Sequence, residues 1–180
     1  MVKVIIVNGA PKTGKSSFEK ECVRLLSIKG KGVGVIRSSV DFVKDVAKYC
    51  GWDGEKTPKN RKFLSDLKAL LTEWRDVPFK KIVQEAMILS EERQKYVMFV
   101  DCREPKEIDK LKKRLNAFTI LVRRPDVEDE VASNESDANV FNYDYDLVIR
   151  NEFGIEELSC MAEYFIDIRL DEVKEYEYDY

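Results

Sequence analysis

The stretch GAPKTGKS, residues 9–16, restricts the fold of this chain more than any other feature of its sequence. It satisfies the pattern G-x-x-x-x-G-K-[ST], which acts as a phosphate-binding loop when a strand precedes it and a helix follows it. Both neighbours are present. The apolar run KVIIV (3–7) is typical of a strand buried on both faces, and apolar residues between positions 18 and 26 recur at helical spacing. The sequence therefore predicts a P-loop.

The residues of this loop suggest what it binds. The residues expected to contact the cofactor in this stretch are Gly9, Ala10, Pro11, Lys12, Thr13, Gly14, Lys15, Ser16 and Ser17. The two glycines let backbone N–H groups approach phosphate oxygens, and the helix N-terminus adds the positive end of its dipole. Lys15 is expected to reach the β- and γ-phosphates, and the Ser16 hydroxyl is expected to ligate Mg²⁺. ATP and Mg²⁺ are the predicted cofactors.

Strand-like and helix-like segments alternate along the chain. Further strands are predicted at 33–37, 96–101, 118–122 and 145–149, and helices at 38–50, 63–74, 79–87, 105–115 and 155–165. This alternation predicts an α/β fold: a three-layer α-β-α sandwich with a five-stranded parallel sheet, in a single domain spanning 1–180. The acidic tail, 171–180, is expected to be a frayed, solvated end.

Charged residues follow the predicted strands. Asp101 ends the apolar run VMFV, as in a Walker-B strand, where such an aspartate helps to hold Mg²⁺. Arg37, Arg103, Arg123 and Arg124 lie at or just after the carboxyl ends of strands, where ligands of parallel sheets bind. Since guanidinium groups grip phosphate well, at least two of these arginines are expected to clamp a second, phosphorylated substrate.

Composition excludes several classes of function. With 31 basic and 34 acidic residues the net charge is −3, which disfavours general nucleic-acid binding. No apolar run approaches the roughly 20 residues of a membrane span. The four cysteines are widely spaced and there is no histidine, so a zinc site is disfavoured and the thiols suggest a cytoplasmic protein with reduced, mostly buried cysteines. A homodimer is left open.

The class of P-loop protein can be narrowed further. The chain has no N-K-x-D motif of guanine-reading GTPases and no L-S-G-G-Q motif of transporter ATPases, which leaves a small phosphoryl-transfer enzyme. The absence of histidine removes the commonest general base. A phosphate monoester, with a second pKa near ~6, is already nucleophilic at neutral pH. A hydroxyl acceptor would need a carboxylate, for which Asp41 or Asp101 is available.

Four further stretches, taken in order with the phosphate loop, carry a resemblance to a known family. They are SSVDFVKDVA (38–47), GWDGEKTPKNRKFLSDL (51–67), VDCREPKEI (100–108) and SNESDANVFNYDYDLVIRNEFGIEEL (133–158). With them the chain resembles the nucleoside monophosphate kinases, most closely the small deoxynucleoside monophosphate kinase-like proteins of phages and bacteria. The resemblance spans nearly the whole chain, but only the phosphate loop is strongly specific by itself.

The resemblance implies where an acceptor binds. It implies a sheet in which the first and third strands are neighbours, and an acceptor-binding helical segment at about 38–75. Within it, Ser39 and Asp41 would approach the acceptor nucleoside and Arg61 would grip its phosphate, together with Arg103. Arg37, at the end of the second strand, is a further candidate for binding the substrate.

The resemblance also implies a donor side. Arg123 and Arg124 would stand at the hinge of a short lid-like segment at about 125–144, and Asn151 would border the donor adenine. The chain departs from the family here, because it has no lysine or arginine between Pro125 and Tyr145. Lys12 is expected to compensate.

The implied function is transfer of the ATP γ-phosphoryl group to a (deoxy)nucleoside monophosphate, with Lys15, Arg61, Arg103 and Asp101 as the catalytic residues. Two alternatives remain open: a P-loop kinase of another small metabolite, and a nucleotide-binding module with little or no kinase activity. The absence of basic residues from the lid favours the second alternative.

Overall fold

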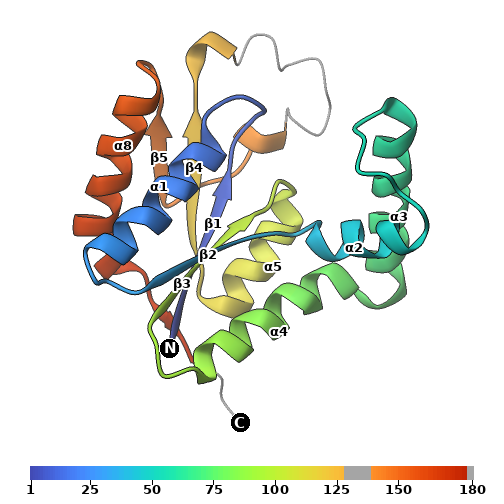
Figure 1. Cartoon of the computed structure of the whole chain (residues 1–180), viewed down its shortest axis with the longest axis horizontal. Helices are drawn as coiled ribbons and strands as arrows, with labels where there is room; N and C mark the ends of the chain where they lie inside the picture. The colour runs from blue at the N-terminus through green and yellow to red at the C-terminus, as the bar shows by residue number, and fades with distance from the viewer. Residues whose placement is uncertain (128–138, 178–180) are drawn as a thin grey trace.

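A computed structural model describes residues 1–127 and 139–177 of this chain (Figure 1). Most of the predicted lid segment, 125–144, therefore lies outside the described residues. The helices and strands are β1 (Val2–Asn8), α1 (Lys15–Ile28), β2 (Val33–Ser38), α2 (Asp41–Tyr49), α3 (Pro58–Arg75), α4 (Val77–Glu91), β3 (Tyr96–Asp101), α5 (Pro105–Leu115), β4 (Phe118–Arg123), η1 (Asn139–Phe141), β5 (Leu147–Arg150), α8 (Ile155–Tyr164), η2 (Phe165–Arg169), η3 (Leu170–Glu172) and β6 (Glu175–Tyr176).

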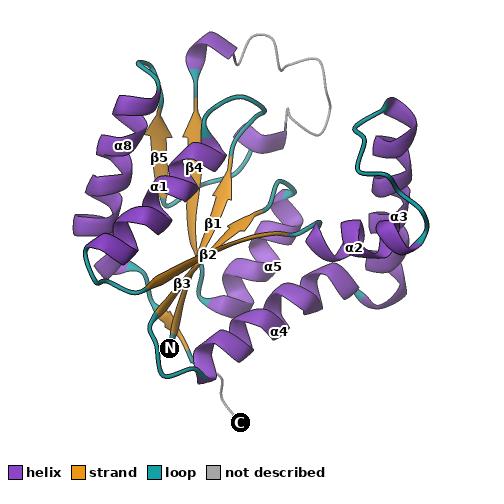
Figure 2. Cartoon of the chain, viewed as in Figure 1, coloured by secondary structure: helices purple, strands orange, loops and turns teal. Residues whose placement is uncertain are grey.

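Five strands form a parallel sheet in the order β2-β3-β1-β4-β5. Helices cover both of its faces (Figure 2). The predicted three-layer α/β sandwich is confirmed, as is the expected pairing of the first and third strands. Because β1 lies at the centre, the loop that follows it opens at the carboxyl edge of the sheet, between the ends of β3 and β4.

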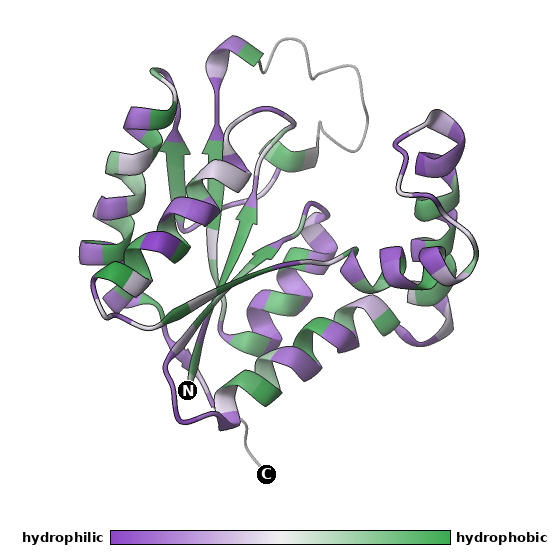
Figure 3. Cartoon of the chain, in the orientation of Figure 1, coloured by the Kyte–Doolittle hydropathy of each residue, from purple (hydrophilic) through white to green (hydrophobic). Residues whose placement is uncertain are grey.

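The core has two halves, one on each face of the sheet. Ile5 and Val7 of β1 face α1 and α8, whereas Val4 and Ile6 face α4 and α5. This alternation follows from the period of two along a strand. Figure 3 shows the result, with strands that are mostly apolar and helices that alternate between apolar and polar faces. Of the four free cysteines, Cys22 and Cys102 are buried, whereas the other two are exposed.

The chain end differs from its prediction. The tail was expected to fray, but Glu175 and Tyr176 form β6, which pairs antiparallel with the start of β1 and makes a sixth strand. Tyr176 is 2% exposed and packs in the core half beside α5. Acidic residues around this one aromatic side chain concealed its burial in the sequence, because contact with β1 exists only in the folded chain.

The helices α2 and α3 form an arm beside the sheet (Figure 1). Thr57 caps α3 by accepting the Asn60 N–H at 3.2 Å, and Pro58 occupies the first turn. α3 packs on α2 and α4, yet none of its residues is buried. No described helix is long and apolar enough to cross a membrane.

Candidate functional site

The phosphate loop joins β1 to α1 through a backbone path that needs both of its glycines. A Cβ atom on Gly9 would lie 2.6 Å from the Val122 carbonyl oxygen of β4. Gly14 has φ of 98°, and a Cβ atom there would lie 2.6 Å from Leu158 Cδ1 and 2.8 Å from Asn151 Nδ2. The loop is therefore packed against the ends of β4 and β5, and its form is fixed from outside.

Polar contacts inside the loop also help to fix its conformation. The Thr13 hydroxyl donates to the Ala10 carbonyl at 2.9 Å, and Lys12 takes the left-handed conformation with φ of 67°. Asn151 is 2% exposed and donates from Nδ2 to the Thr13 carbonyl at 2.9 Å, while its Oδ1 accepts the Gly154 N–H at 3.0 Å. Asn151 lies beside the loop, as its predicted place near the donor requires, but both sides of its amide are occupied by the chain itself.

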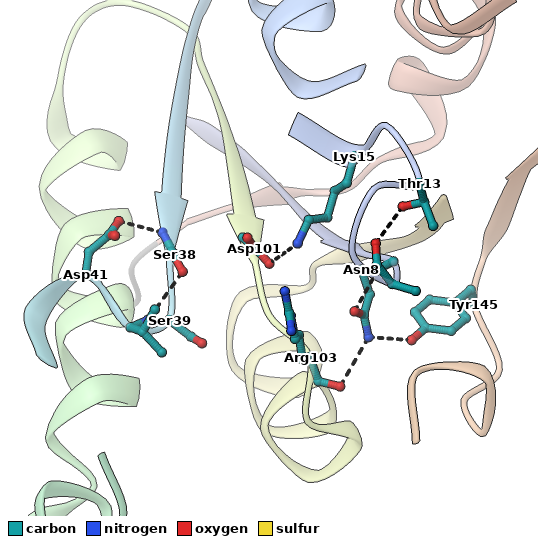
Figure 4. Close-up of polar contacts among 12 residues, drawn as sticks. Asn8, Thr13, Lys15, Ser38, Ser39, Asp41, Asp101, Arg103 and Tyr145 are labelled. Atoms are coloured by element: carbon teal, nitrogen blue, oxygen red, sulfur yellow. Dashed lines mark hydrogen bonds and ion pairs between the residues drawn. The ribbon is translucent and has the colours of Figure 1, made fainter. Parts of the chain in front are cut away.

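Lys15 and Asp101 form an ion pair across the sheet (Figure 4). Lys15 begins α1, Asp101 ends β3, and their Nζ and Oδ1 atoms are 2.5 Å apart. They meet because β1 and β3 are parallel neighbours in register, with Val7 opposite Asp101. The Lys15 side chain is 9% exposed, so this charge is largely removed from water.

Glu19 lies one helical turn after Lys15, and it was not predicted from the sequence. It is 2% exposed, and its Oε1 atom has no hydrogen-bond partner among the described residues. Burial, with the nearby Asp101 charge, raises the pKa of Glu19 from 4.5 to about 7, while Lys15 lowers it less strongly. In the sequence, only its position four residues after Lys15 could have indicated that Glu19 belongs to this site.

A hollow of about 550 Å³ lies over the phosphate loop. It is lined by residues 10–17, by Asp101 at the end of β3 and Arg103 just after it, by Arg124 after β4, and by Asn151, Gly154, Ile155 and Leu158 in and before α8. In Figure 4 the Arg103 side chain points toward the space beside Lys15 and Asp101. Arg123 and Arg124 were both expected on the donor side, where the cofactor binds. The Arg123 guanidinium lies 5.0 Å from the centre of the Phe141 ring, whereas its neighbour Arg124 lines the hollow.

The other predicted acceptor residues do not line this hollow. Arg37, Ser39 and Asp41 line a second hollow of about 730 Å³ between the end of β2, α2 and α4. Arg37 faces α4 because it shares a face of β2 with Val35, and it pairs with Glu85. Arg61 is exposed on α3 and lines neither hollow. The structure thus groups Arg103 with the phosphate loop and places Arg37 and Arg61 away from it, whereas the Ser39 N–H donates to the Asp101 carbonyl oxygen at 3.0 Å.

One polar cluster near the acceptor side was missed. Lys68 of α3 pairs with Glu107 of α5 at 2.7 Å, and its Nζ lies 3.5 Å from the hydroxyl of the buried Ser39. This contact joins the helical arm to the sheet domain. A lysine in the middle of an amphipathic helix carries no sequence signal that distinguishes it from a solvated one.

The donor atoms suit a nucleotide with its magnesium ion. Among residues 1–127 and 139–177 there is no cluster of three or more His, Cys, Asp or Glu side chains that would hold a metal unaided. Mg²⁺ commonly takes one or two protein ligands and completes its shell with phosphate oxygens and water. Ser16 and Asp101 are available for this purpose, and the glycine-lined loop leaves room for phosphate groups.

No protein-family model matches the sequence, and no curated protein matches it. Solved structures with a similar fold include three kinases. A shikimate kinase from Aquifex aeolicus is 15% identical with a TM-score of 0.47, covering 91% of this chain and 96% of its own. A sugar kinase from Janibacter sp. is 13% identical with a TM-score of 0.49, covering 97% and 99%. A shikimate kinase from Acinetobacter baumannii, in complex with shikimate, is 10% identical with a TM-score of 0.48, covering 96% and 95%.

Likeness at this level assigns neither activity nor substrate to this chain. The parallel sheet and the phosphate loop are assigned from the geometry described above. The resemblance to nucleoside monophosphate kinases stays a prediction.

The buried Glu19 predicts a pH dependence of stability. Because its pKa is raised on folding, the folded protein binds more protons than the unfolded chain between pH 4.5 and about 7. The free energy of unfolding should therefore fall as pH rises through this window, by at most about 3 kcal/mol from this group. Glu19→Gln should remove this component of the slope, as measured by urea denaturation at pH 5 and pH 8.

Glu92→Gln, at an exposed site after α4, is the matched control and should keep the wild-type slope. If Glu19→Gln and Glu92→Gln show the same difference between the two pH values, the raised pKa of Glu19 is wrong.

Proposed function

We propose that this protein is an ATP-dependent kinase that transfers the γ-phosphoryl group to a small acceptor, and that the acceptor is a (deoxy)nucleoside monophosphate. The observation that carries the proposal is the convergence of Lys15, Asp101, Arg103 and Arg124 on one hollow above a phosphate loop. The three cations come from three different elements. Such an arrangement suits a reaction in which positioning and charge neutralisation provide most of the catalysis.

Each of these side chains has a distinct part in the proposal. Lys15 neutralises the β- and γ-phosphates once it exchanges its bond to Asp101 for phosphate oxygens. Asp101 is then available, with Ser16, to bind the magnesium ion, which supplies charge neutralisation when bound. Arg103 and Arg124 hold phosphate groups on the acceptor and donor sides. Arg124 provides a cation near the segment that has no basic residues between 125 and 145.

A second candidate function is a kinase of another small metabolite. The observation that favours it is that neither Arg37 nor Arg61 lines the hollow that Arg103 lines, because a monophosphate clamp would need these guanidinium groups around one acceptor phosphate. A carboxylate-assisted hydroxyl acceptor requires only Asp101 close to the phosphate loop, and the Lys15–Asp101 pair places it there. The shikimate kinase and the sugar kinase with similar folds suggest shikimate and sugars as further acceptors for the same assay.

A coupled kinase assay tests the proposal and the alternatives together. The panel contains the ribo- and deoxyribonucleoside monophosphates, shikimate and several sugars, each with ATP and Mg²⁺. We expect turnover with at least one monophosphate. Lys15→Ala should reduce it by about 10²-fold or more because it loses a charged contact to the transferred group. Lys20→Ala, an exposed lysine on the same helix, should match the wild type.

Turnover with shikimate or a sugar alone would support the second candidate. Nucleotide binding without transfer to any acceptor would indicate a binding module, and wild-type turnover in Lys15→Ala would contradict the phosphate-loop assignment.

The Lys15–Asp101 pair makes the effect of Asp101→Asn depend on metal. The variant loses one carboxylate charge near the proposed ion, so the affinity for ATP with Mg²⁺ should fall by about ten-fold. Metal-free ATP should bind at least as tightly as to the wild type, because Lys15 no longer has to leave a carboxylate. Isothermal titration with and without EDTA measures both. Equal weakening under the two conditions would argue that Asp101 is only structural.

The acceptor side is tested with two arginines. Arg103→Ala and Arg61→Ala should each lower kcat/KM for the acceptor by about ten- to hundred-fold, the loss of a bidentate contact of roughly 1.5–3 kcal/mol. The affinity for ATP should change little. Lysine at either position should rescue only in part, since an ammonium group cannot form two parallel bonds. Arg75→Ala, at the far end of α3, is the control.

A loss of ATP affinity in both variants with unchanged acceptor kinetics would place these arginines on the donor side. An effect of Arg103→Ala alone would remove Arg61 and the helical arm from the proposed clamp.

A further inference from the structure

A buried amide lies directly beneath the phosphate loop and has no part in the function proposed above. Asn8 is the last residue of β1 and the one polar side chain that ends its apolar run. Its exposure is 0%. A buried amide that lacks partners is costly, so the hydrogen bonds of this side chain determine what surrounds it.

Three groups share the Asn8 amide (Figure 4). Its Oδ1 accepts the N–H of Gly9, the first residue of the phosphate loop, at 2.8 Å. Its Nδ2 donates to the Arg103 carbonyl oxygen at 3.2 Å and to the Tyr145 hydroxyl at 2.7 Å. The Tyr145 hydroxyl in turn donates to the Val140 carbonyl oxygen at 2.8 Å.

In each of these hydrogen bonds, only one assignment of donor and acceptor is possible. A backbone N–H can only donate and a carbonyl oxygen can only accept, so the orientation of the Asn8 amide is fixed by Gly9 and Arg103. The Tyr145 hydroxyl gives its proton to Val140 and must therefore accept from Asn8. The Tyr145 hydroxyl is protonated at neutral pH, as in any tyrosine, and burial raises its pKa further, to about 12. Every polar atom of the amide is used.

We infer that Asn8 is a positioning residue that holds the start of the phosphate loop and the Arg103 backbone in one fixed relation, and that Tyr145 completes this function. The inference rests on the proposed function for its effect on turnover. Lys15 and Arg103 must act on the two sides of one transferred group, and they come from separate loops. Asn8 is the side chain that bonds to both loops. Through Tyr145 it also fixes η1, where the Arg123 guanidinium lies over the Phe141 ring.

The same segment provides a matched pair of variants. Tyr145→Phe removes only the hydroxyl that accepts from Asn8. Tyr143→Phe makes the same change two residues away, in a ring 5.0 Å from that of Tyr145, where the hydroxyl donates to Asp109 at 3.0 Å and touches neither loop. Both variants are compared with the wild type by circular dichroism, kinetics with the best acceptor, isothermal titration of ATP with Mg²⁺, and exchange of the Gly9 amide proton followed by NMR.

We expect Tyr145→Phe to lower kcat by about ten-fold, with KM for ATP changed by less than about three-fold, because misplacement of reacting groups reduces turnover more than binding. Exchange of the Gly9 amide should be faster by about five-fold or more, since loss of one partner loosens the amide that protects it. Tyr143→Phe should match the wild type in both measurements. Equal behaviour of the two variants would overturn the inference, as would a lower melting temperature in Tyr145→Phe with kcat and Gly9 exchange unchanged.

Asn8→Ala provides an independent arm. It removes the acceptor of the Gly9 N–H and the donor to Arg103 and Tyr145, so kcat should fall at least as far as in Tyr145→Phe and Gly9 exchange should be at least as fast. Adding Tyr145→Phe to Asn8→Ala should cost little more, because both changes remove the same bond. Additive losses would overturn the inference. If the wild type transfers phosphate to no acceptor, the proposed function fails, and the Gly9 exchange of the Tyr pair alone decides whether Asn8 positions the loop.

Discussion

The central place of β1 in the parallel sheet is the constraint on which the site depends. Pairing with β3 on one side and β4 on the other brings Val7 opposite Asp101 and Asn8 opposite Leu121. The phosphate loop must then leave the sheet between two strand ends, packed so closely that Gly9 has no space for a Cβ atom. Since all five parallel strands end at the same edge, the charged residues that follow them collect around this loop.

The charged side chains at this edge of the sheet lie close to one another and are largely shielded from water. Lys15 is neutralised by Asp101, and the buried Glu19 lies near both. With two carboxyl groups beside a single ammonium group, ionising both carboxyl groups is unfavourable. Burial and the Asp101 charge therefore raise the pKa of Glu19. A ligand that brings phosphate charge competes with Asp101 for Lys15, whereas a divalent cation relieves the repulsion between the carboxylates. The site therefore suits a nucleotide and its metal together.

The helical arm is the part of the molecule whose role depends most on the acceptor. α3 buries none of its residues and is tied to the sheet domain through the Lys68–Glu107 pair beside Ser39. An element with few buried apolar contacts opens locally at a lower free-energy cost than the core. Arg61 lies on this helix, so its distance from the phosphate loop is set by the position of the arm. Arg37, by contrast, is held against α4 by its ion pair with Glu85 and does not line the hollow over the phosphate loop.

The sequence by itself determined the class of fold, the phosphate loop and the place of Asp101, because these follow from local periodicity and from a motif whose spacing is fixed by phosphate geometry. Only the tertiary structure decided which arginines face the loop. Arg123 and Arg124 are adjacent in the chain, yet Arg123, the last residue of β4, lies against Phe141, whereas Arg124, just after the strand, lines the hollow. Glu19 acquires its role from burial and from the charge of Asp101, and Asn8 and Tyr145 acquire theirs from burial and from a hydrogen bond between residues 137 positions apart. No local pattern encodes such contacts, since they depend on which strands become neighbours, and the same reason made β6 look like a solvated tail.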